Sequence, residues 1–561
     1  MRINILSKPK HLVFITITLV LAVSAGFGYL RPGIAHAAPA TFTVTNTNDS
    51  GAGSLRAAIA SANSNGNPGD QDIINFDINS DAPGDVTIQP QSQLVVSQSV
   101  LINGYSQGDA AANDQTWPEP LNGTLRVVLD MSVSTELSIT ASNVTLQGLV
   151  FYNDAESDNG SPDVVVNNGD GFKTYGNYFG TTSNGLKLGR YKGSSNKSLV
   201  IQNSANVDIG GSQPERRNLF GYCARSCIEM TGVETTNVTM FGNYVGVGAD
   251  GITSLDTSQY SNYVIRNEAV YIDDNVASVN IGGTAAGQGN TIERNTSGSI
   301  FAQDSSDIEI YGNRLSYNGP SNAIQTSGIT FRGVTDSVIG AENGQNILGL
   351  QRNSVRIDDS LVTNNPSLNI IIQDNLIGVD DDGVTAMENI EGIKVSGGSQ
   401  EISILNNVIH NTSDALYIYD VSYPGIQVDG TAQKVSILGN SIYNSSSEGI
   451  RLGGGGNFDD TLDADEGPNG LLNSPGYTDI VETGGDTEVT FTADIPAGDY
   501  RIEFFENTVA DPDYPGEGET FIGFANITSS GTGLEEFFTT LSGDGYTNID
   551  LTATERNVAT D

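Results

Sequence analysis

A short apolar pattern repeats along most of this 561-residue chain. Each copy contains an apolar–x–apolar triplet, in which x is any residue. A Gly or Asn and a further apolar residue accompany the triplet, as in 143–149 and 308–313. The copies begin at positions 144, 172, 207, 238, 279, 308, 337, 370, 402 and 435, which lie 28 to 41 residues apart, and only Ser337 is not apolar. Alternation with a period of two inside a long repeat predicts the coils of a β-solenoid, and it excludes helices, whose period is 3.6.

Most coils contain a second short strand, in which a small residue precedes an apolar–x–apolar triplet. Copies occur at 227–230, 269–272, 328–331, 354–357, 392–395, 415–418 and 449–452. A strand of three or four residues is not stable alone. Stacked on equivalent strands about 4.8 Å away, it buries a continuous column of Ile and Val.

Asparagine recurs where the chain leaves the first strand of a coil. The positions are Asn177, Asn243, Asn313, Asn375, Asn407 and Asn440, and Gly148 occupies the same register. Asn tolerates the left-handed backbone of a sharp turn, and its amide can bond the Asn of the next coil. We therefore expect these asparagines to form one line.

A longer repeat is superimposed on the short one. The segments 176–185, 242–251 and 374–383 match one another, and their starts are offset by 66 and 132 residues. Each ends in Asn-Gly or Asp-Gly, which is typical of a tight turn. These loops are expected to project from one side of the solenoid.

The region from about 90 to 455 resembles the right-handed parallel β-helix of the pectate-lyase-like class. The segment 42–59 is similar to the start of bacterial secreted β-helix proteins, whose signature is Cys-Ser-Leu-Arg-Glu-Ala. Ser54, Leu55, Arg56 and Ala58 fit that signature, whereas Gly53 and Ala57 replace its Cys and Glu. The segment 449–473 resembles the exit of such proteins. The resemblance implies an architecture but no activity, because lyases, hydrolases, epimerases, phage tailspikes and adhesins share this fold.

The two ends of the chain differ from the middle. Residues 1–37 are predicted to be a secretory signal peptide, with a basic start, an apolar run at 12–23 and a small-x-small site at 35–37. Residues 38–90 are expected to be an N-terminal cap with one amphipathic helix at 54–62. No second apolar stretch is long enough to span a membrane, so the mature chain is expected to be secreted.

The fold class predicted is all-β: a right-handed parallel β-helix of about ten coils over 91–472, followed by a β-sandwich over 473–561. The alternating runs 487–493, 500–505 and 520–525 are typical of antiparallel strands, and the domain resembles an immunoglobulin-like sandwich. It is expected to be a truncated one, since its last run, 548–554, is followed by only seven residues.

The formal charge of −42 disfavours nucleic acid and anionic lipid as partners. The acidity is consistent with a surface that is exposed to divalent cations. Alternatively, it only keeps a secreted protein soluble. The two cysteines, Cys223 and Cys227, are too few for a zinc site and have no nearby histidine. They form either a local disulfide or two reduced thiols.

The middle residue of the second strand points outward, so these residues form an exterior stripe. It consists of Glu229, Tyr271, Thr330, Arg356, Lys394, Tyr417 and Arg451, with Asp273, Asp274, Asp358, Asp359, Asp420 and Asp429 just past the strands. Aromatic faces and charged groups bind sugars by stacking and hydrogen bonding. The ligand-binding residues predicted are Tyr271, Arg356, Lys394, Tyr417 and Arg451.

Catalysis on the same stripe is the alternative. Arg356 and Lys394 near Asp358 and Asp359 resemble the pectate lyases, in which Asp-bound calcium acidifies a carbon-bound proton and an Arg acts as base. A hydrolase would use paired carboxylates instead, either Asp358 with Asp359 or Asp273 with Asp274. The Gly-His-Gly and Arg-Ile-Lys of polygalacturonases do not occur.

One acidic segment is a candidate calcium site. Within 459–469, the residues Asp460, Asp463, Asp465, Glu466 and Asn469 supply closely spaced oxygen ligands of the kind that calcium prefers. An acidic linker between the two domains is the other interpretation.

Two functional hypotheses follow from the sequence. The first is a secreted or cell-surface protein that binds a polysaccharide or a neighbouring surface without catalysis, as in adhesion. The alternative is a calcium-dependent polysaccharide lyase or another glycan-cleaving enzyme.

Overall fold

The protein is described by a computed structural model. It describes residues 38–65, 70–78, 84–133, 136–153, 161–188, 197–221, 223, 225–253, 268–293, 298–316, 327–350, 352–387, 389–410, 423–445, 447–454, 459–509, 517–546 and 548–555. The predicted signal peptide, 1–37, lies outside the described residues. No helix among those residues is both long and apolar enough to cross a membrane.

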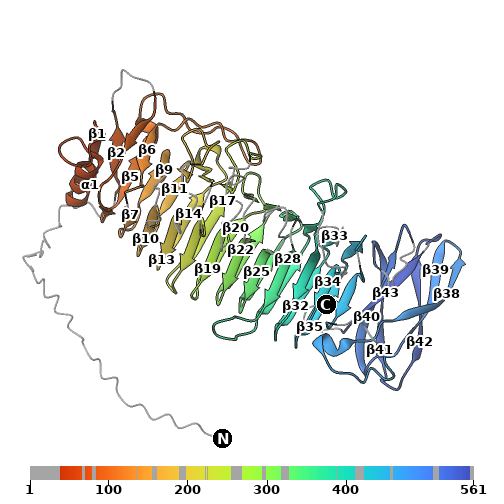
Figure 1. Ribbon diagram of the computed structural model, residues 1–561. Coiled ribbons are helices and arrows are strands. Elements are labelled where there is room, and N and C mark those ends of the chain that lie inside the picture. The colour runs from red at the N-terminus through yellow and green to blue at the C-terminus, as the bar shows by residue number, and fades with distance from the viewer. Residues whose placement is uncertain are drawn as a thin grey trace, which may run out of the picture. The chain divides into compact units, whose positions relative to one another are not determined.

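The chain folds into a right-handed parallel β-helix, which confirms the predicted fold class. Three parallel sheets, here called A, B and C, have 13, 12 and 12 strands within the described residues, more than the ten coils expected. Each coil runs from sheet A to sheet B to sheet C, and Figure 1 shows the coils following one another along the chain from red to cyan.

Sheet A contains the strands that carry the primary repeat. In spatial order they are β1 (Thr41–Val44), β2 (Asp72–Phe76), β5 (Val100–Asn103), β8 (Thr145–Gln147), β11 (Lys173–Tyr175), β14 (Ala205–Gly210), β17 (Thr236–Phe241), β20 (Ala277–Gly282), β23 (Ser306–Tyr311), β26 (Thr335–Ile339), β29 (Leu368–Gln373), β32 (Gln400–Leu405) and β35 (Gln433–Leu438).

Sheet B follows sheet A in every coil. Its strands are β3 (Val86–Ile88), β6 (Val127–Asp130), β9 (Leu149–Tyr152), β12 (Tyr178–Phe179), β15 (Leu219–Phe220), β18 (Tyr244–Val245), β21 (Thr291–Glu293), β24 (Arg314–Ser316), β27 (Ile347–Gly349), β30 (Leu376–Ile377), β33 (Val408–His410) and β36 (Ser441–Tyr443).

Sheet C completes each coil and contains the second sequence pattern. Its strands are β4 (Leu94–Val96), β7 (Leu137–Ile139), β10 (Val164–Asn167), β13 (Leu199–Gln202), β16 (Ile228–Thr231), β19 (Val270–Asp273), β22 (Gly298–Gln303), β25 (Ser327–Arg332), β28 (Asn353–Asp358), β31 (Glu391–Val395), β34 (Ile426–Val428) and β37 (Ile450–Leu452).

The interior of the solenoid is filled by the alternate residues of all three sheets. Ile370 and Ile372 of β29 are fully buried, for example, whereas Ile371 between them points outward. Aromatic residues stack along the inside of sheet B, where the rings of Phe151, Phe179 and Phe220 follow one another at centroid distances of 4.7 and 4.6 Å. Burial of this continuous apolar column is the main stabilising contribution to the coils.

A line of asparagines runs along the turn between sheets A and B, as the sequence predicts. The side-chain amide of Asn407, for example, donates to the carboxamide oxygen of Asn440 at 2.9 Å and to the backbone oxygen of Ile372 at 2.9 Å. The line is longer than predicted, because it includes three further members. The ladder consists of Asn177, Asn218, Asn243, Asn290, Asn313, Asn346, Asn375, Asn407 and Asn440.

The projecting loops close in tight turns, as predicted. Gly185, Gly251 and Gly383 have φ angles of +67°, +74° and +69°. The loops of the first two copies touch, because the backbone N–H of Ala249 donates to the oxygen of Gly185.

A long excursion of the chain, 107–125, is attached to later coils. The side chain of Arg217 is fully buried and donates to the backbone oxygens of Gln115 and Glu119 at 2.7 and 2.8 Å. The indole of Trp117 reaches the hydroxyl of Thr291 at 3.0 Å. The excursion therefore covers part of the outer face of sheet B.

The N-terminal segment forms the expected helix, α1 (Leu55–Ser64). Ser54 is its N-cap and accepts the N–H of Ala57, while Leu55 is buried. Arg56 binds Asp49 at 2.7 Å and the backbone oxygens of residues 92 and 93. This segment also contributes β1, β2 and β3 to the sheets, so the solenoid begins inside the region expected to be only a cap.

The C-terminal segment forms two antiparallel sheets of three strands around a shared apolar cluster. The strands are β38 (Gly476–Thr483), β39 (Asp486–Ala493), β40 (Gly498–Glu506), β41 (Thr520–Ser529), β42 (Glu535–Ser542) and β43 (Ile549–Glu555). Three short 3-10 helices, η1 (Gly104–Ser106), η2 (Pro214–Arg216) and η3 (Pro468–Leu471), lie in connections of the solenoid and at its end.

The exposed edges of the last coil are partly covered. The backbone N–H of Ile442 in sheet B donates to the oxygen of Gly518 at 2.7 Å. The side chain of Asn469 accepts the N–H of Val435 and donates to its oxygen, as a further strand of sheet A would do. Such contacts block the pairing of a free sheet edge with another chain.

Candidate functional site

The outer face of sheet C presents one column of side chains, one from each coil. In β28 the buried Val355 and Ile357 flank Arg356, which points outward because side chains alternate along a strand. The paired positions of the column are Glu229, Tyr271, Phe301, Thr330, Arg356, Lys394, Gln427 and Arg451. Most of the predicted stripe therefore lies on one line.

Tyr417 and Asp420 lie outside the described residues. The position between Lys394 and Arg451, where Tyr417 was expected, belongs to Gln427 of β34. The expected neighbour relationship of Lys394, Tyr417 and Arg451 is therefore wrong.

Two aromatic rings form a flat surface in the middle of the column. The rings of Tyr271 and Phe301 stack with a centroid distance of 5.3 Å and an angle of 5° between their planes. The hydroxyl of Tyr271 donates to Oδ2 of Asp273 at 2.7 Å, and burial together with this bond raises the pKa of the phenol. Tyr271 is therefore a neutral side chain that is fixed in position.

Two arginines extend the aromatic surface. The guanidinium carbon of Arg332 lies 5.7 Å from the centroid of Phe301, a distance typical of a cation–π contact. Arg332 follows the column residue Thr330 by two positions, so it lies on the same face as Arg356 of the next coil. We call Tyr271, Phe301, Arg332 and Arg356 the arginine–aromatic platform.

The two guanidiniums of the platform influence each other. Burial and the neighbouring charge of Arg356 lower the pKa of Arg332. Within the described residues, the Nε atoms of Arg332 and Arg356 are buried and have no hydrogen-bond partner. Two adjacent cations favour an anionic or strongly polar ligand.

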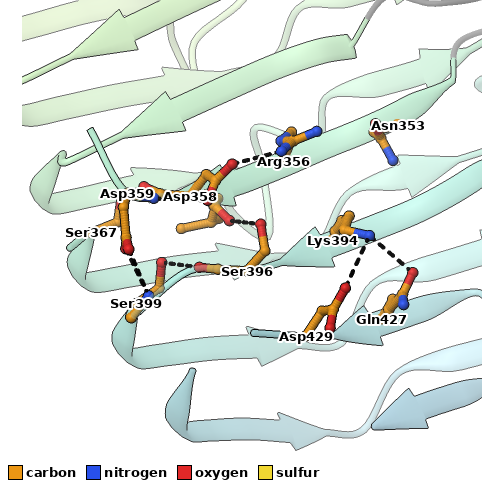
Figure 2. Close-up of polar contacts among 12 residues, drawn as sticks. Asn353, Arg356, Asp358, Asp359, Ser367, Lys394, Ser396, Ser399, Gln427 and Asp429 are labelled. Carbon is orange, nitrogen blue, oxygen red and sulfur yellow. Dashed lines mark hydrogen bonds and ion pairs between the residues drawn. The ribbon is translucent and has the colours of Figure 1, made fainter. Parts of the chain in front are cut away.

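The cations of the column, Arg356 of the platform included, are engaged in ion pairs (Figure 2). Arg356 donates to Oδ2 of Asp358 at 2.6 Å. Lys394 lies 3.6 Å from Oδ2 of Asp429 and donates to Oε1 of Gln427 at 3.2 Å. These pairs restrict the positions of the two side chains on the sheet. Arg451 pairs with Glu448 in the last coil.

The carboxylates proposed for catalysis are held in separate contacts. Burial opposes the ionisation of Asp358, but its bonds from Arg356 outweigh that effect and hold its pKa below the ordinary value. Both oxygens of Asp359 accept the backbone N–H of Gly398, at 2.8 and 2.9 Å. Asp358 and Asp359 therefore serve different partners and do not face one another across a substrate site.

The second proposed pair behaves similarly. Asp273 accepts the hydroxyl of Tyr271, and its other oxygen accepts the N–H of Asp274. Asp273 and Asp274 instead line a groove of about 560 Å³ at the turn from sheet C to sheet A, together with Asp304 and Thr363. This groove offers hydroxyl-binding oxygens close to the platform.

Several of the predicted calcium ligands in the acidic segment 459–469 have partners within the protein. Across the residues that the structure describes, no three His, Cys, Asp or Glu side chains converge closely enough to hold a metal ion. The side-chain amide of Asn469, one of the predicted ligands, bonds the backbone of Val435, as described above. Asp460 and Asp463 accept the backbone N–H groups of Ala464 and Asn473.

The acidic segment nevertheless concentrates charge. Burial and the carboxylates of Asp465, Asp460 and Asp494 raise the pKa of Asp463 to about 6, although the N–H of Asn473 opposes this shift. Among the described residues, one buried oxygen each of Asp465 and Asp494 has no hydrogen-bond partner. Calcium binding by Asp460, Asp463, Asp465, Glu466 and Asn469 remains a prediction.

The two cysteines are joined. The Sγ atoms of Cys223 and Cys227 are 1.96 Å apart, and both residues are buried in the solenoid core. The disulfide alternative is therefore confirmed. Its place between β15 and β16 makes it a structural link rather than part of the platform.

Two platform residues were missed in the sequence analysis. Phe301 lies in Ser299-Ile300-Phe301-Ala302, which fits the small–apolar–x–apolar pattern. Arg332 lies two residues after Thr330, as Asp358 lies two residues after Arg356. The spacing that predicts carboxylates beside the stripe therefore also predicts Arg332 there.

No protein-family model matches the chain, and no curated protein matches it. Solved structures with similar folds include a Dettilon tailspike protein (12% identity, TM-score 0.43, covering 91% of this chain and 94% of that one). They also include PfbA, a surface adhesin of Streptococcus pneumoniae (14%, 0.38, 73% and 88%). A third is the periplasmic alginate epimerase AlgG (10%, 0.29, 65% and 77%). Similarity of this extent carries no statement about what this chain binds.

Proposed function

We propose that this protein is a secreted or cell-surface β-helix protein that binds a polysaccharide, or a glycan-bearing surface, without cleaving it. The observation that carries the proposal is the arginine–aromatic platform. Sugar rings stack their C–H faces on aromatic rings such as Tyr271 and Phe301. Arg332 and Arg356 place positive charge beside those rings, which favours the hydroxyl or carboxylate oxygens of a ligand.

The shape of the site favours a polymer over a small molecule. Consecutive side chains of the column are separated by steps of about 5 Å along the solenoid axis. The platform spans the coils of β19, β22, β25 and β28, and its residues lie on the outer face of a sheet. An extended chain that runs along the axis would contact several of these coils at once.

The contacts of the charged residues support binding rather than catalysis. Arg356 is held by Asp358, Asp359 by Gly398, and Asp273 by Tyr271. A group that acts as base or nucleophile needs to reach the substrate, whereas these groups are hydrogen-bonded to neighbouring protein atoms.

The proposal is tested by a glycan array probed with the purified protein, combined with turnover assays. Polygalacturonate and alginate are incubated with the protein, with and without calcium, and unsaturated products are followed by ultraviolet absorbance. We expect retention of at least one glycan class and no product. Product formation that Arg356→Ala abolishes would establish the lyase alternative, and failure to retain any glycan would refute the proposal.

A further inference from the structure

A second array of aromatic residues lies on the outer face of sheet A. The tripeptide aromatic-Gly-Asn ends three of its strands, at 175–177, 241–243 and 311–313. The aromatic residues are Tyr175 of β11, Phe241 of β17 and Tyr311 of β23, and all three are half-buried. They differ from the ladder asparagines in facing out of the solenoid.

The three aromatic residues occupy every second coil. The strand between β11 and β17 has Gly210 in this position, where it pairs with Phe241. The strand between β17 and β23 has Gly282 there, where it pairs with Tyr311. Since neighbouring strands are about 4.8 Å apart, successive rings are about 10 Å apart along the axis.

The gaps between the rings are fixed by the backbone. Gly210 and Gly282 have φ angles of +79° and +72°. A Cβ atom at Gly210 would lie 2.3 Å from the oxygen of Phe241, and one at Gly282 would lie 2.0 Å from the oxygen of Tyr311. At these two positions the coils therefore place no side chain between the rings.

A hydrogen bond holds Tyr175 in place, and Tyr311 lies among carboxylates. The hydroxyl of Tyr175 donates to Oδ2 of Asp208 at 2.8 Å. Burial and the nearby carboxylates of Glu309 and Asp307 raise the pKa of Tyr311 to about 12, which keeps its hydroxyl protonated. Rings that are fixed in this way lose little rotational freedom when a ligand stacks on them.

Loops of the next coil lie beside each aromatic residue of the array. The backbone N–H that follows each aromatic residue donates to a loop of the next coil: Gly176 to Arg216, Gly242 to Gln288 and Gly312 to Gly344. At the N-terminal end, Tyr175 and Arg216 border a groove of about 440 Å³. The guanidinium of Arg216 lies 4.7 Å from the ring centroid of Tyr175.

The polar groups beside the rings suit hydroxyls better than carboxylates. The neighbouring outward column, in coil order, contains Lys173, Asp208, Thr239, Asn280 and Glu309. Two of these five are acids and two are neutral, so an anionic polymer would meet like charge. This property distinguishes sheet A from the platform on sheet C.

We propose that Tyr175, Phe241 and Tyr311 form a binding site for an uncharged, extended β-linked polysaccharide that lies along the solenoid axis. The ring spacing of about 10 Å is close to the length of one disaccharide unit in such a chain, so every second sugar stacks on a ring. The site lies on another sheet from the platform, and the inference does not rest on the proposed function.

The test is calorimetric titration of the full-length protein with β-1,4-linked glucose oligosaccharides of two to six units. Three rings cover a length of about 20 Å, so affinity should rise with chain length up to about five sugars and then level off. An α-1,4-linked glucose hexasaccharide, which coils instead of extending, is the matched control ligand and should bind more weakly.

Substitutions separate this site from the platform. We expect Phe241→Ala and Tyr311→Ala each to weaken binding of the β-linked hexasaccharide roughly fivefold, while Phe241→Trp preserves it. Tyr271→Ala on sheet C should leave this binding unchanged. Thermal unfolding of each variant verifies that the fold is retained.

Three results would overturn the inference. They are the absence of hexasaccharide binding by the wild-type protein, equal affinity for the two hexasaccharides, and unchanged affinity in both folded alanine variants. Loss of binding in Tyr271→Ala with retention in Phe241→Ala would instead assign neutral glycans to sheet C.

Discussion

Arg332 lies against Phe301, with its guanidinium carbon 5.7 Å from the ring centroid and its Nε buried without a partner among the described residues. The ring supports the guanidinium from one side, and Arg356 of the next coil adds a second positive charge. This arrangement concentrates positive charge on the surface of a chain whose formal charge is −42.

Arg332→Gln should weaken binding of polygalacturonate oligomers roughly fivefold to tenfold, because it removes a cation beside an aromatic surface. It should also flatten the dependence of affinity on salt, since that dependence reflects charge pairing. Titration at two salt concentrations measures both effects. Lys434→Gln, which removes an exposed charge from sheet A, is the control and should bind as the wild type does.

Ile372→Asp should unfold the coils around β29. The side chain is fully buried in the apolar column, and an unpaired charge there is expected to cost more than about 4 kcal/mol of unfolding free energy. Ile371→Asp is the matched control, because the neighbouring side chain points outward; its cost should stay near 1 kcal/mol. Equal losses in urea denaturation would contradict the alternation on which the solenoid depends.

Asn290→Ala tests one of the ladder positions that the sequence analysis missed. Its carboxamide oxygen accepts the N–H of Asn243, and its amide donates to the backbone oxygen of Met240. Removal leaves buried polar groups unpaired, so we expect a loss of about 1 to 3 kcal/mol in the free energy of unfolding. Asn280→Ala, on the outer face of the same coil, should change it by much less. A neutral Asn290→Ala would show that the ladder contributes little to stability.

The raised pKa of Asp463 predicts a pH-dependent difference between the wild type and Asp463→Asn. An acid whose pKa is higher in the folded than in the unfolded state lowers stability as it ionises, so the wild type should lose stability relative to the variant between about pH 4 and pH 6. At pH 8 the variant should melt at the higher temperature, and near pH 4 the two should coincide. A difference that does not change with pH would contradict this explanation.

Calcium provides a second comparison at the same segment. If the carboxylates of Asp460, Asp463 and Asp465 bind the ion, calcium should raise the melting temperature of the wild type more than that of Asp463→Ala, by mass action on the folded state. Equal responses would leave the acidic-linker interpretation.

The sequence predicts the solenoid well because each coil repeats the same local pattern. Six ladder asparagines follow their strand directly and are therefore visible in the sequence. Loops that begin with Ile-Gly, as at 209–218, separate the other three asparagines, Asn218, Asn290 and Asn346, from their strands. These three therefore do not align with the asparagines of the shorter coils.

Longer-range relationships are not encoded in a local pattern. In one coil both 415–418 and 425–428 fit the second strand, and the pairing of Ile426 with Ile393 and Ile450 selects the latter. A pattern of four residues contains too little information to make this choice. The contact between Arg217 and the excursion near Gln115 spans about a hundred residues and depends on the finished coils.

Glycan binding by the outer face of sheet C is tested by calorimetric titration of the glycan that the array retains most strongly. The titration compares the wild type with the double variant Tyr271→Ala, Phe301→Ala. The two substitutions remove neighbouring outward rings from sheet C. The control is Gln202→Ala, which lies in an earlier coil of the same sheet. We predict at least roughly tenfold weaker binding in the double variant at an unchanged melting temperature. Equal affinity of the folded double variant and the wild type would contradict the assignment of glycan binding to this face.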